Sequence, residues 1–121
     1  MGKVLVVDDE IDICILLGRQ LEKMGLEVSY CLTIKEAIEK LSHETYDLIF
    51  IDLNITDGSG YDLISSLSGL NSEALVIVIS AYDSERDKAL QAGASWFVAK
   101  PFSKRSIKEA LQKVKFLNNL Q

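Results

Sequence analysis

Short, unbroken apolar runs constrain the fold of this chain more than any other feature of its sequence. Each run contains four to six residues, mostly Val, Ile, Leu and Phe, with no polar residue between them. Such runs are typical of strands buried on both faces of a parallel sheet, because a sheet with one solvated face shows polar alternation. Four runs stop at polar residues: VLVV at Asp8 and Asp9, LIFI at Asp52, ALVIVI at Ser80, and WFVA at Lys100.

Segments with helical spacing separate these runs. Thr33 and Glu36 form a T-x-x-E capping box, and Gly25, Gly69 and Gly93 are C-terminal stop signals. The predicted strands are 3–8, 26–31, 47–52, 74–80 and 95–99. The predicted helices are 10–24, 33–43, 59–69, 83–92, and one that begins after Ser103 with Ile107, Ala110, Leu111, Val114 and Leu117 on one face. The segment from Leu53 to Gly58 is predicted to be a loop.

Strict alternation of buried strands and helices predicts right-handed crossovers with helices on both faces of the sheet. The expected fold is α/β: a doubly wound (βα)5 three-layer sandwich whose five parallel strands lie in the flavodoxin-like order 2-1-3-4-5. Ligands bind beyond the carboxyl ends of such strands. The polar residues that end the four runs are therefore expected to meet at one edge, although most of the chain separates the first from the last.

Size and composition fit one domain covering residues 1–121. The net charge of −5 argues against direct nucleic-acid binding, which usually needs a basic face. No apolar stretch approaches the roughly 20 residues of a membrane span, so we expect a cytoplasmic protein with no membrane contact. The two cysteines, Cys14 and Cys31, form no CxxC pair and are expected to be core residues.

Three neighbouring carboxylates need a counter-charge, because unit charges 4 Å apart repel by about 4 kcal/mol at an effective dielectric near 20. Oxygen ligands without His or Cys favour Mg²⁺, and Lys100 supplies a second positive charge. Asp52 stands alone at its strand end and is the candidate nucleophile, while Asp8 and Asp9 form a pair suited to ion binding. The Ser80 hydroxyl could donate a hydrogen bond to a phosphoryl oxygen.

The chain resembles the receiver domain of bacterial two-component response regulators from end to end, because its motifs occur in the same order. The resemblance implies the CheY-like form of the flavodoxin arrangement. The matching segments are VLVVDDE at 4–10, DLNITDGSG at 52–60, SA at 80–81, and AGASWFVAKPF at 92–102.

The resemblance implies that Asp52 accepts a phosphoryl group from a sensor histidine kinase or a phosphotransfer protein. It implies that Asp8, Asp9, Asp52 and the backbone carbonyl of Asn54 arrange Mg²⁺, and that Lys100 assists the reaction. The chain would assist its own phosphorylation and dephosphorylation without being a turnover enzyme for a metabolite.

The resemblance also implies a switch. Ser80 would be drawn toward the phosphoryl group, Phe97 would turn inward, and the surface of the fourth helix, fifth strand and fifth helix would change its affinity for partners. The bond from Lys100 to Pro101 is expected to be cis. Expected partners of that surface are a downstream protein, a missing C-terminal output domain, or a second copy of the chain in a phosphorylation-dependent dimer.

Some residues depart from the family pattern. Thr56 stands where the family usually has proline, and Phe97 lacks the hydroxyl that a tyrosine would bring. Asn54 and Tyr82 occupy the positions that tune dephosphorylation in the family.

Two other functions compete with the switch. A phosphatase of the haloacid dehalogenase type would need an aspartate at the position of Asn54, and a module that signals without phosphate would not need the acidic set, Ser80 and Lys100. The chain ends just after the last predicted helix, so a stand-alone receiver and the N-terminal part of a longer regulator both stay open.

Overall fold

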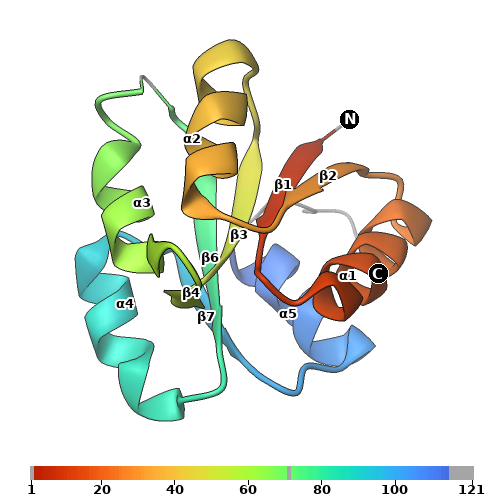
Figure 1. Cartoon of the computed structure of the whole chain (residues 1–121). Coiled ribbons are helices and arrows are strands. Elements are labelled where there is room, and N and C mark those ends of the chain that lie inside the picture. The colour runs from red at the N-terminus through yellow and green to blue at the C-terminus, as the bar shows by residue number, and fades with distance from the viewer. Residues whose placement is uncertain (1, 71, 115–121) are drawn as a thin grey trace.

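Five parallel strands form the central sheet of the computed structural model, which describes residues 2–70 and 72–114. The strands are β1 (Lys3–Val7), β2 (Glu27–Cys31), β3 (Leu48–Asp52), β6 (Leu75–Ser80) and β7 (Trp96–Ala99). Their spatial order is β2-β1-β3-β6-β7, with all neighbours parallel (Figure 1). The two short strands β4 and β5 lie outside this sheet, so the order is the predicted 2-1-3-4-5 order and confirms it.

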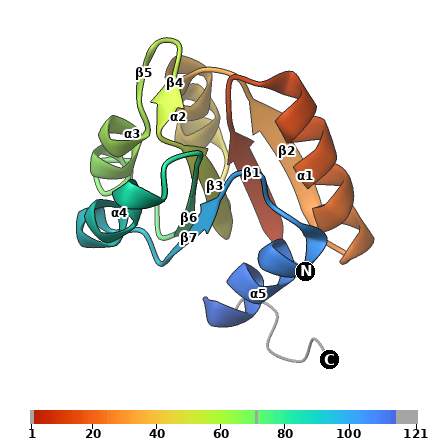
Figure 2. The same cartoon turned by 90° about the horizontal axis from the view of Figure 1, so that it is seen from below.

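Helices cover both faces of the sheet. Helices α1 (Ile11–Lys23) and α5 (Lys104–Lys113) lie on one face, and α2 (Ile34–His43), α3 (Gly60–Ser66) and α4 (Arg86–Ala92) lie on the other (Figure 2). Alternate residues of each strand enter different cores. In β1, for example, Val4 and Val6 pack with α1 and α5, while Leu5 and Val7 pack with the opposite helices. This double burial explains the unbroken apolar runs and confirms the three-layer sandwich.

The local signals act much as predicted at several helix ends. Thr33 Oγ1 accepts a hydrogen bond from Glu36 N at 3.0 Å, and Glu36 Oε1 accepts one from Leu32 N at 3.0 Å. The glutamate therefore reaches an amide one residue before the capping residue. Gly25 and Gly93 have positive φ angles of 87° and 120° beyond the ends of α1 and α4, a conformation that favours glycine.

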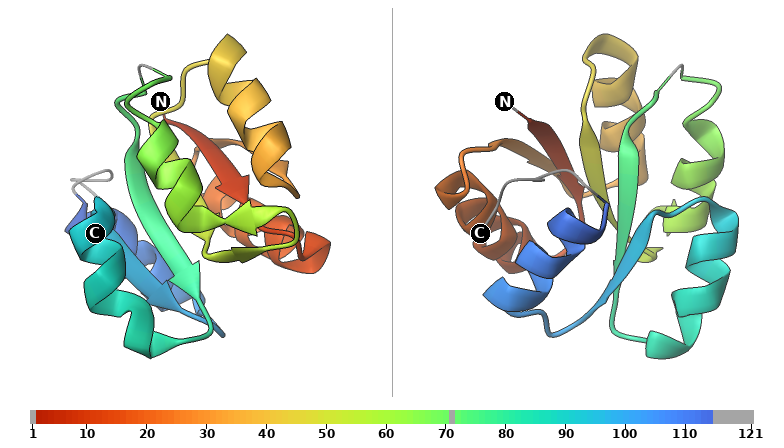
Figure 3. Two further views of the ribbon diagram at one scale, coloured as in Figure 1. Left: turned by 60° about the vertical axis from the view of Figure 1, so that its left-hand side comes forward. Right: turned by 180° about the vertical axis from the view of Figure 1, so that it is seen from behind.

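The structure differs from the sequence prediction in three elements. The predicted loop after β3 contains an antiparallel hairpin of β4 (Asn54–Ile55) and β5 (Gly58–Ser59), seen in the left view of Figure 3. Helix α3 ends at Ser66, before the predicted stop at Gly69. The first turn of the fourth predicted helix is a 3-10 helix, η1 (Asp83–Glu85). Two-residue strands and single turns are too short to produce a hydrophobic period.

The remaining core predictions concern α5 and the cysteines. Ile107, Ala110 and Leu111 are buried in α5, and Leu117 lies outside the described residues. Cys14 and Cys31 are buried free thiols, and burial raises the pKa of each to about 12. Within residues 2–70 and 72–114, no helix has both the length and the apolar character of a membrane span.

Candidate functional site

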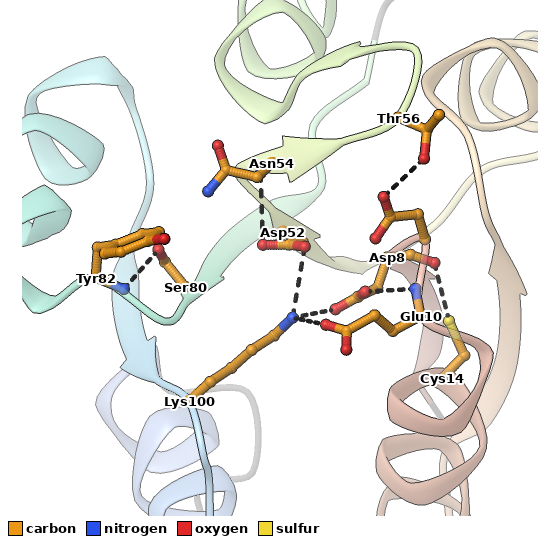
Figure 4. Close-up of polar contacts among 10 residues, drawn as sticks. Asp8, Glu10, Cys14, Asp52, Asn54, Thr56, Ser80, Tyr82 and Lys100 are labelled. Atoms are coloured by element: carbon orange, nitrogen blue, oxygen red, sulfur yellow. Dashed lines mark hydrogen bonds and ion pairs between the residues drawn. The ribbon is translucent and has the colours of Figure 1, made fainter.

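The carboxyl ends of four parallel strands bring the predicted polar residues to one edge of the sheet. Asp8 follows β1, Asp52 ends β3, Ser80 ends β6 and Lys100 follows β7. The strand registers align these ends: Asp52 of β3 pairs with Ile79 of β6, and Ser80 of β6 pairs with Ala99 of β7. The side chains of Asp52, Asp8 and Lys100 accordingly converge on a common centre (Figure 4).

Lys100 lies among three carboxylates at this edge. Its ammonium nitrogen is 2.9 Å from Asp8 Oδ2, 3.0 Å from Glu10 Oε1 and 3.4 Å from Asp52 Oδ2. Asp8 has no exposed surface and Asp52 is 5% exposed, so these charges interact with little screening by solvent. Residues that follow the first and the last strand of the chain are thus joined in one cluster (Figure 4).

Short backbone contacts orient the two buried carboxylates. Asp8 Oδ1 accepts a hydrogen bond from Glu10 N at 2.9 Å, and Asp52 Oδ1 accepts a longer one from Asn54 N at 3.5 Å. The Cys14 thiol donates to the backbone carbonyl of Asp8 at 3.3 Å and so ties α1 to the end of β1. Each acid therefore has one oxygen held by backbone and the other directed at Lys100.

Burial and mutual repulsion shift the pKa values of the cluster. Burial and the nearby charge of Asp8 raise the pKa of Asp52 to about 6, although the Lys100 ammonium opposes this rise. Burial also raises the pKa of Asp8, against the effect of Lys100 and the amide of Glu10. Burial alone would lower the pKa of Lys100, but its ion pairs with Asp8 and Glu10 and the charge of Asp52 raise it overall. Lys100 is therefore a fixed cation at neutral pH.

The donor set fits a hard divalent cation. One carboxylate oxygen from each of Asp8, Asp9, Glu10 and Asp52 lies within 4.8 Å of the others. The buried Asp8 Oδ2 receives no hydrogen bond of good geometry, despite its closeness to Lys100. The cluster has four carboxylates and one ammonium, which leaves excess negative charge, and all the donors are oxygens, the ligand type that Mg²⁺ prefers.

Ser80 and its neighbours connect this edge to the following helix. Ser80 is fully buried, and its Oγ accepts a hydrogen bond from Tyr82 N at 3.1 Å, two residues into the loop that leads to η1 (Figure 4). The carbonyl of Ser80 accepts a hydrogen bond from Lys100 N at 2.8 Å. The peptide bond between Lys100 and Pro101 is cis. Ser80 and Lys100 are thus joined by a backbone hydrogen bond and lie at the same edge of the sheet.

Phe97 lies inside the molecule. It is 2% exposed and belongs to the core under α2, α3 and α4, whereas its neighbour Trp96 packs toward α5. The guanidinium carbon of Arg86, the first residue of α4, is 4.9 Å from the centre of the Phe97 ring. The inward position of Phe97 is thus the one present in this structure.

The structure adds contacts that sequence reasoning did not predict. Glu10 is a third acidic partner of Lys100, and its only sequence signal is its position directly after the acidic pair. The Thr56 hydroxyl donates a hydrogen bond to Asp9 Oδ2 at 2.9 Å, and the Asp57 carboxylate accepts hydrogen bonds from the amides of Ile34 and Lys35. These contacts depend on the unpredicted hairpin between β3 and α3.

A flavodoxin-like sheet that carries acidic loops after β1 and β3, a hydroxyl after β6 and a lysine after β7 defines a receiver. A model of the response regulator receiver domain matches residues 4–112, and the chain belongs to this family.

Two curated relatives are similar to nearly the whole chain. The sensory transduction protein LytR of Streptococcus agalactiae is 33% identical over 122 residues, which cover 98% of this chain and 50% of that protein. The response regulator protein PilR of Pseudomonas aeruginosa is 37% identical over 119 residues, which cover 97% of this chain and 27% of that protein. The chain therefore spans half or less of the length of these relatives.

A solved structure has the same fold. The response regulator protein TrrA of Thermotoga maritima, in complex with Mg²⁺ and BeF, superimposes with a TM-score of 0.84 at 30% identity, covering 94% of this chain and 99% of that one. As a member of the receiver family, the chain is a signalling switch controlled by phosphorylation.

Proposed function

We propose that Asp52 accepts a phosphoryl group from a histidine of a sensor kinase or a phosphotransfer protein. One Asp52 oxygen forms the new P–O bond, and the P–N bond of the donor breaks with its electron pair leaving on the histidine nitrogen. The observation that carries this proposal is the cluster in which Lys100 joins Asp8, Glu10 and Asp52 at the strand ends. With its pKa near 6, Asp52 is mainly the nucleophilic carboxylate at neutral pH.

We assign Mg²⁺ binding to Asp8, Asp9, Asp52 and the backbone carbonyl of Asn54. The bound ion would supply positive charge that offsets the charge of the incoming phosphoryl oxygens. Two observations support this assignment: the convergence of the carboxylate oxygens, and the complex of the similar TrrA protein with Mg²⁺ and BeF. Lys100 contributes a second cation that needs no metal.

We propose that phosphorylation acts through Ser80 and Phe97. A phosphoryl oxygen on Asp52 would draw the Ser80 hydroxyl away from Tyr82 N, and the loop into η1 and α4 would respond. Phe97 belongs to the core under α3 and α4, and the guanidinium of Arg86, the first residue of α4, lies over its ring. The expected result is a population shift on the surface formed by α4, β7 and α5. A groove there is lined by residues from all three elements, including Arg86, Trp96, Phe102 and Glu109.

The domain and partner assignments belong to the same proposal. Residues 1–121 would form one receiver domain in the cytoplasm, with no direct contact to nucleic acid or membrane. Its α4, β7 and α5 surface would contact a downstream protein, a C-terminal output domain of a longer regulator, or a second copy of the chain. The chain would assist its own phosphorylation and the hydrolysis of the aspartyl phosphate, without turning over a metabolite.

Acyl-phosphate labelling tests the proposal. The protein with Mg²⁺ and a labelled small acyl phosphate should gain an acid-stable, alkali-labile label, and Asp52→Asn should lose it. Asp57→Asn is the matched control, because this exposed acid lies five positions away and contacts the amides of α2. Absence of label in the parent protein would favour a passive binding module. Steady phosphate release from many esters would favour a phosphatase, for which Asn54 lacks the acid function.

A further inference from the structure

The tip of the β4–β5 hairpin is tied to two other parts of the molecule. Thr56 and Asp57 form this tip, between Ile55 of β4 and Gly58 of β5. On one side, Thr56 Oγ1 donates to Asp9 Oδ2 at 2.9 Å (Figure 4). On the other side, Asp57 accepts hydrogen bonds from Ile34 N at 2.8 Å and Lys35 N at 3.1 Å, at the start of α2. The hairpin therefore spans the distance between the acidic loop and a helix terminus.

Asp9 differs from the other carboxylates of the cluster in how it is held. Asp8, Glu10 and Asp52 each contact the Lys100 ammonium, but Asp9 has no such ion pair within the described part of the chain. Asp9 is also only half-buried, so packing fixes it less firmly than Asp8. The hydrogen bond from Thr56 is the side-chain contact that orients the Asp9 carboxylate.

We propose that Thr56 is a positioning residue for the cation site: its hydroxyl holds the Asp9 carboxylate in the orientation that binds Mg²⁺. This inference rests on the proposed function, which assigns Asp9 to the metal. A carboxylate oxygen has two lone pairs, so Asp9 can accept the Thr56 hydrogen bond and still ligate a cation. Hydrogen bonds to metal-binding side chains fix their orientation, and their loss typically weakens metal affinity by about 10- to 100-fold.

Substitutions at residue 56 can distinguish this role of the hydroxyl from a general effect on the conformation of the hairpin. Valine has nearly the shape of threonine but no hydroxyl, so Thr56→Val removes the donor and keeps the volume. Serine keeps the donor and removes a methyl group. Thr56 is exposed, so both changes leave the core intact. Asp57→Ala loosens the same hairpin tip by removing its contacts with α2, and it leaves the bond between Thr56 and Asp9 in place.

Calorimetric titration of the unphosphorylated protein with MgCl₂ in 0.15 M KCl, a salt level chosen to screen distant charges, provides the test. We expect Thr56→Val to raise the Mg²⁺ Kd by about tenfold, at the low end of such effects because the contact is exposed. Thr56→Ser and Asp57→Ala should stay within about threefold of the parent protein, a change smaller than the loss of an orienting hydrogen bond. At saturating MgCl₂, Thr56→Val should still accept label on Asp52.

Three results would overturn the inference: a parental Kd in Thr56→Val, an equally weak Kd in Thr56→Ser, or an equally weak Kd in Asp57→Ala. The last would assign the effect to order in the hairpin instead of the hydroxyl. These results are distinct from failure of the proposed function. If the parent protein bound no Mg²⁺ and took no label, the cation site itself would be wrong, and the role of Thr56 would fall with it.

Discussion

Gly60 begins α3 in close contact with the backbone that carries the candidate acceptor. A Cβ at this position would lie 2.5 Å from the carbonyl oxygen of Asp52 and 2.8 Å from Ile51 Cγ2. Both neighbours are buried in the sheet, so neither can move freely. We predict that Gly60→Ala lowers the free energy of unfolding by about 1–3 kcal/mol, through overpacking, and slows phosphoryl acceptance by displacing Asp52.

Gly58→Ala is the control for this prediction. The stability of both variants is measured by denaturant unfolding, and their phosphoryl acceptance by labelling. A Cβ at Gly58 would meet Ile34 Cγ1 at 3.5 Å, an ordinary van der Waals distance. Its unfolding free energy should change by less than about 0.5 kcal/mol, as for most surface substitutions. Equal stability of the two alanine variants would show that the backbone at Asp52 yields easily.

Asp52 also illustrates the conflict between function and stability at the level of one residue. Without metal, its buried charge faces Asp8, and both share the ammonium of Lys100. We predict that Asp52→Asn raises the unfolding free energy by about 1–2 kcal/mol in EDTA at pH 7, because it relieves repulsion in a buried cluster. Glu39→Gln removes an exposed charge from α2 and should have little effect. An Asp52→Asn variant less stable than the parent protein would contradict this account.

At the scale of elements, α3 and the start of α4 are joined by Tyr61. Its hydroxyl donates to Glu85 Oε1 of η1 at 2.8 Å, and Lys88 Nζ of α4 lies 4.7 Å from its ring centre. Burial and the hydrogen bond to Glu85 raise the pKa of Tyr61 from 10.0 to about 12. This link stabilises the protonated phenol in the folded state, next to the loop that follows Ser80.

The raised pKa of Tyr61 predicts a pH dependence. Between pH 10 and about 12 the folded protein keeps a proton that the unfolded chain releases, so stability from this contact is complete below pH 10 and is lost as pH rises through 12. Tyr61→Phe should lower the unfolding free energy at pH 8 by about 1 kcal/mol, with a smaller difference at pH 11.5. A Tyr61→Phe deficit that is constant with pH would refute the link.

The elements also show what the sequence could predict. The five sheet strands and their order follow from apolar runs that record burial on two faces, as in VLVV before Asp8 and LIFI before Asp52. Because strand ends fix the site, Ser80 and Lys100 could be placed at the same edge in advance. The contacts of Glu10 and Thr56 could not be predicted, because they depend on side-chain directions in loops and on a hairpin whose strands have two residues each. Such elements are stabilised by tertiary contacts and produce no local period.

At the scale of the whole molecule, the site couples cation binding to global folding. Its carboxylates come from the loop after β1 and the end of β3, so the unfolded chain has no assembled site. We predict that MgCl₂ raises the free energy of unfolding, by about 2.7 kcal/mol at one hundred times the Kd. Asp8→Asn should lose most of this gain, because the buried Asp8 Oδ2 is a proposed ligand. KCl of matched ionic strength is the control, and an equal gain with KCl would rule out a specific site.

Lys100 follows the last strand of the sheet and contacts the loop after the first strand. During synthesis, a nascent polypeptide that lacks residue 100 already contains the four carboxylates of the cluster but not the ammonium that offsets their charge. The cluster of carboxylates and ammonium is complete only when the edge strand β7 has docked on β6. The charge balance of the site therefore depends on the docking of β7 at the edge of the sheet.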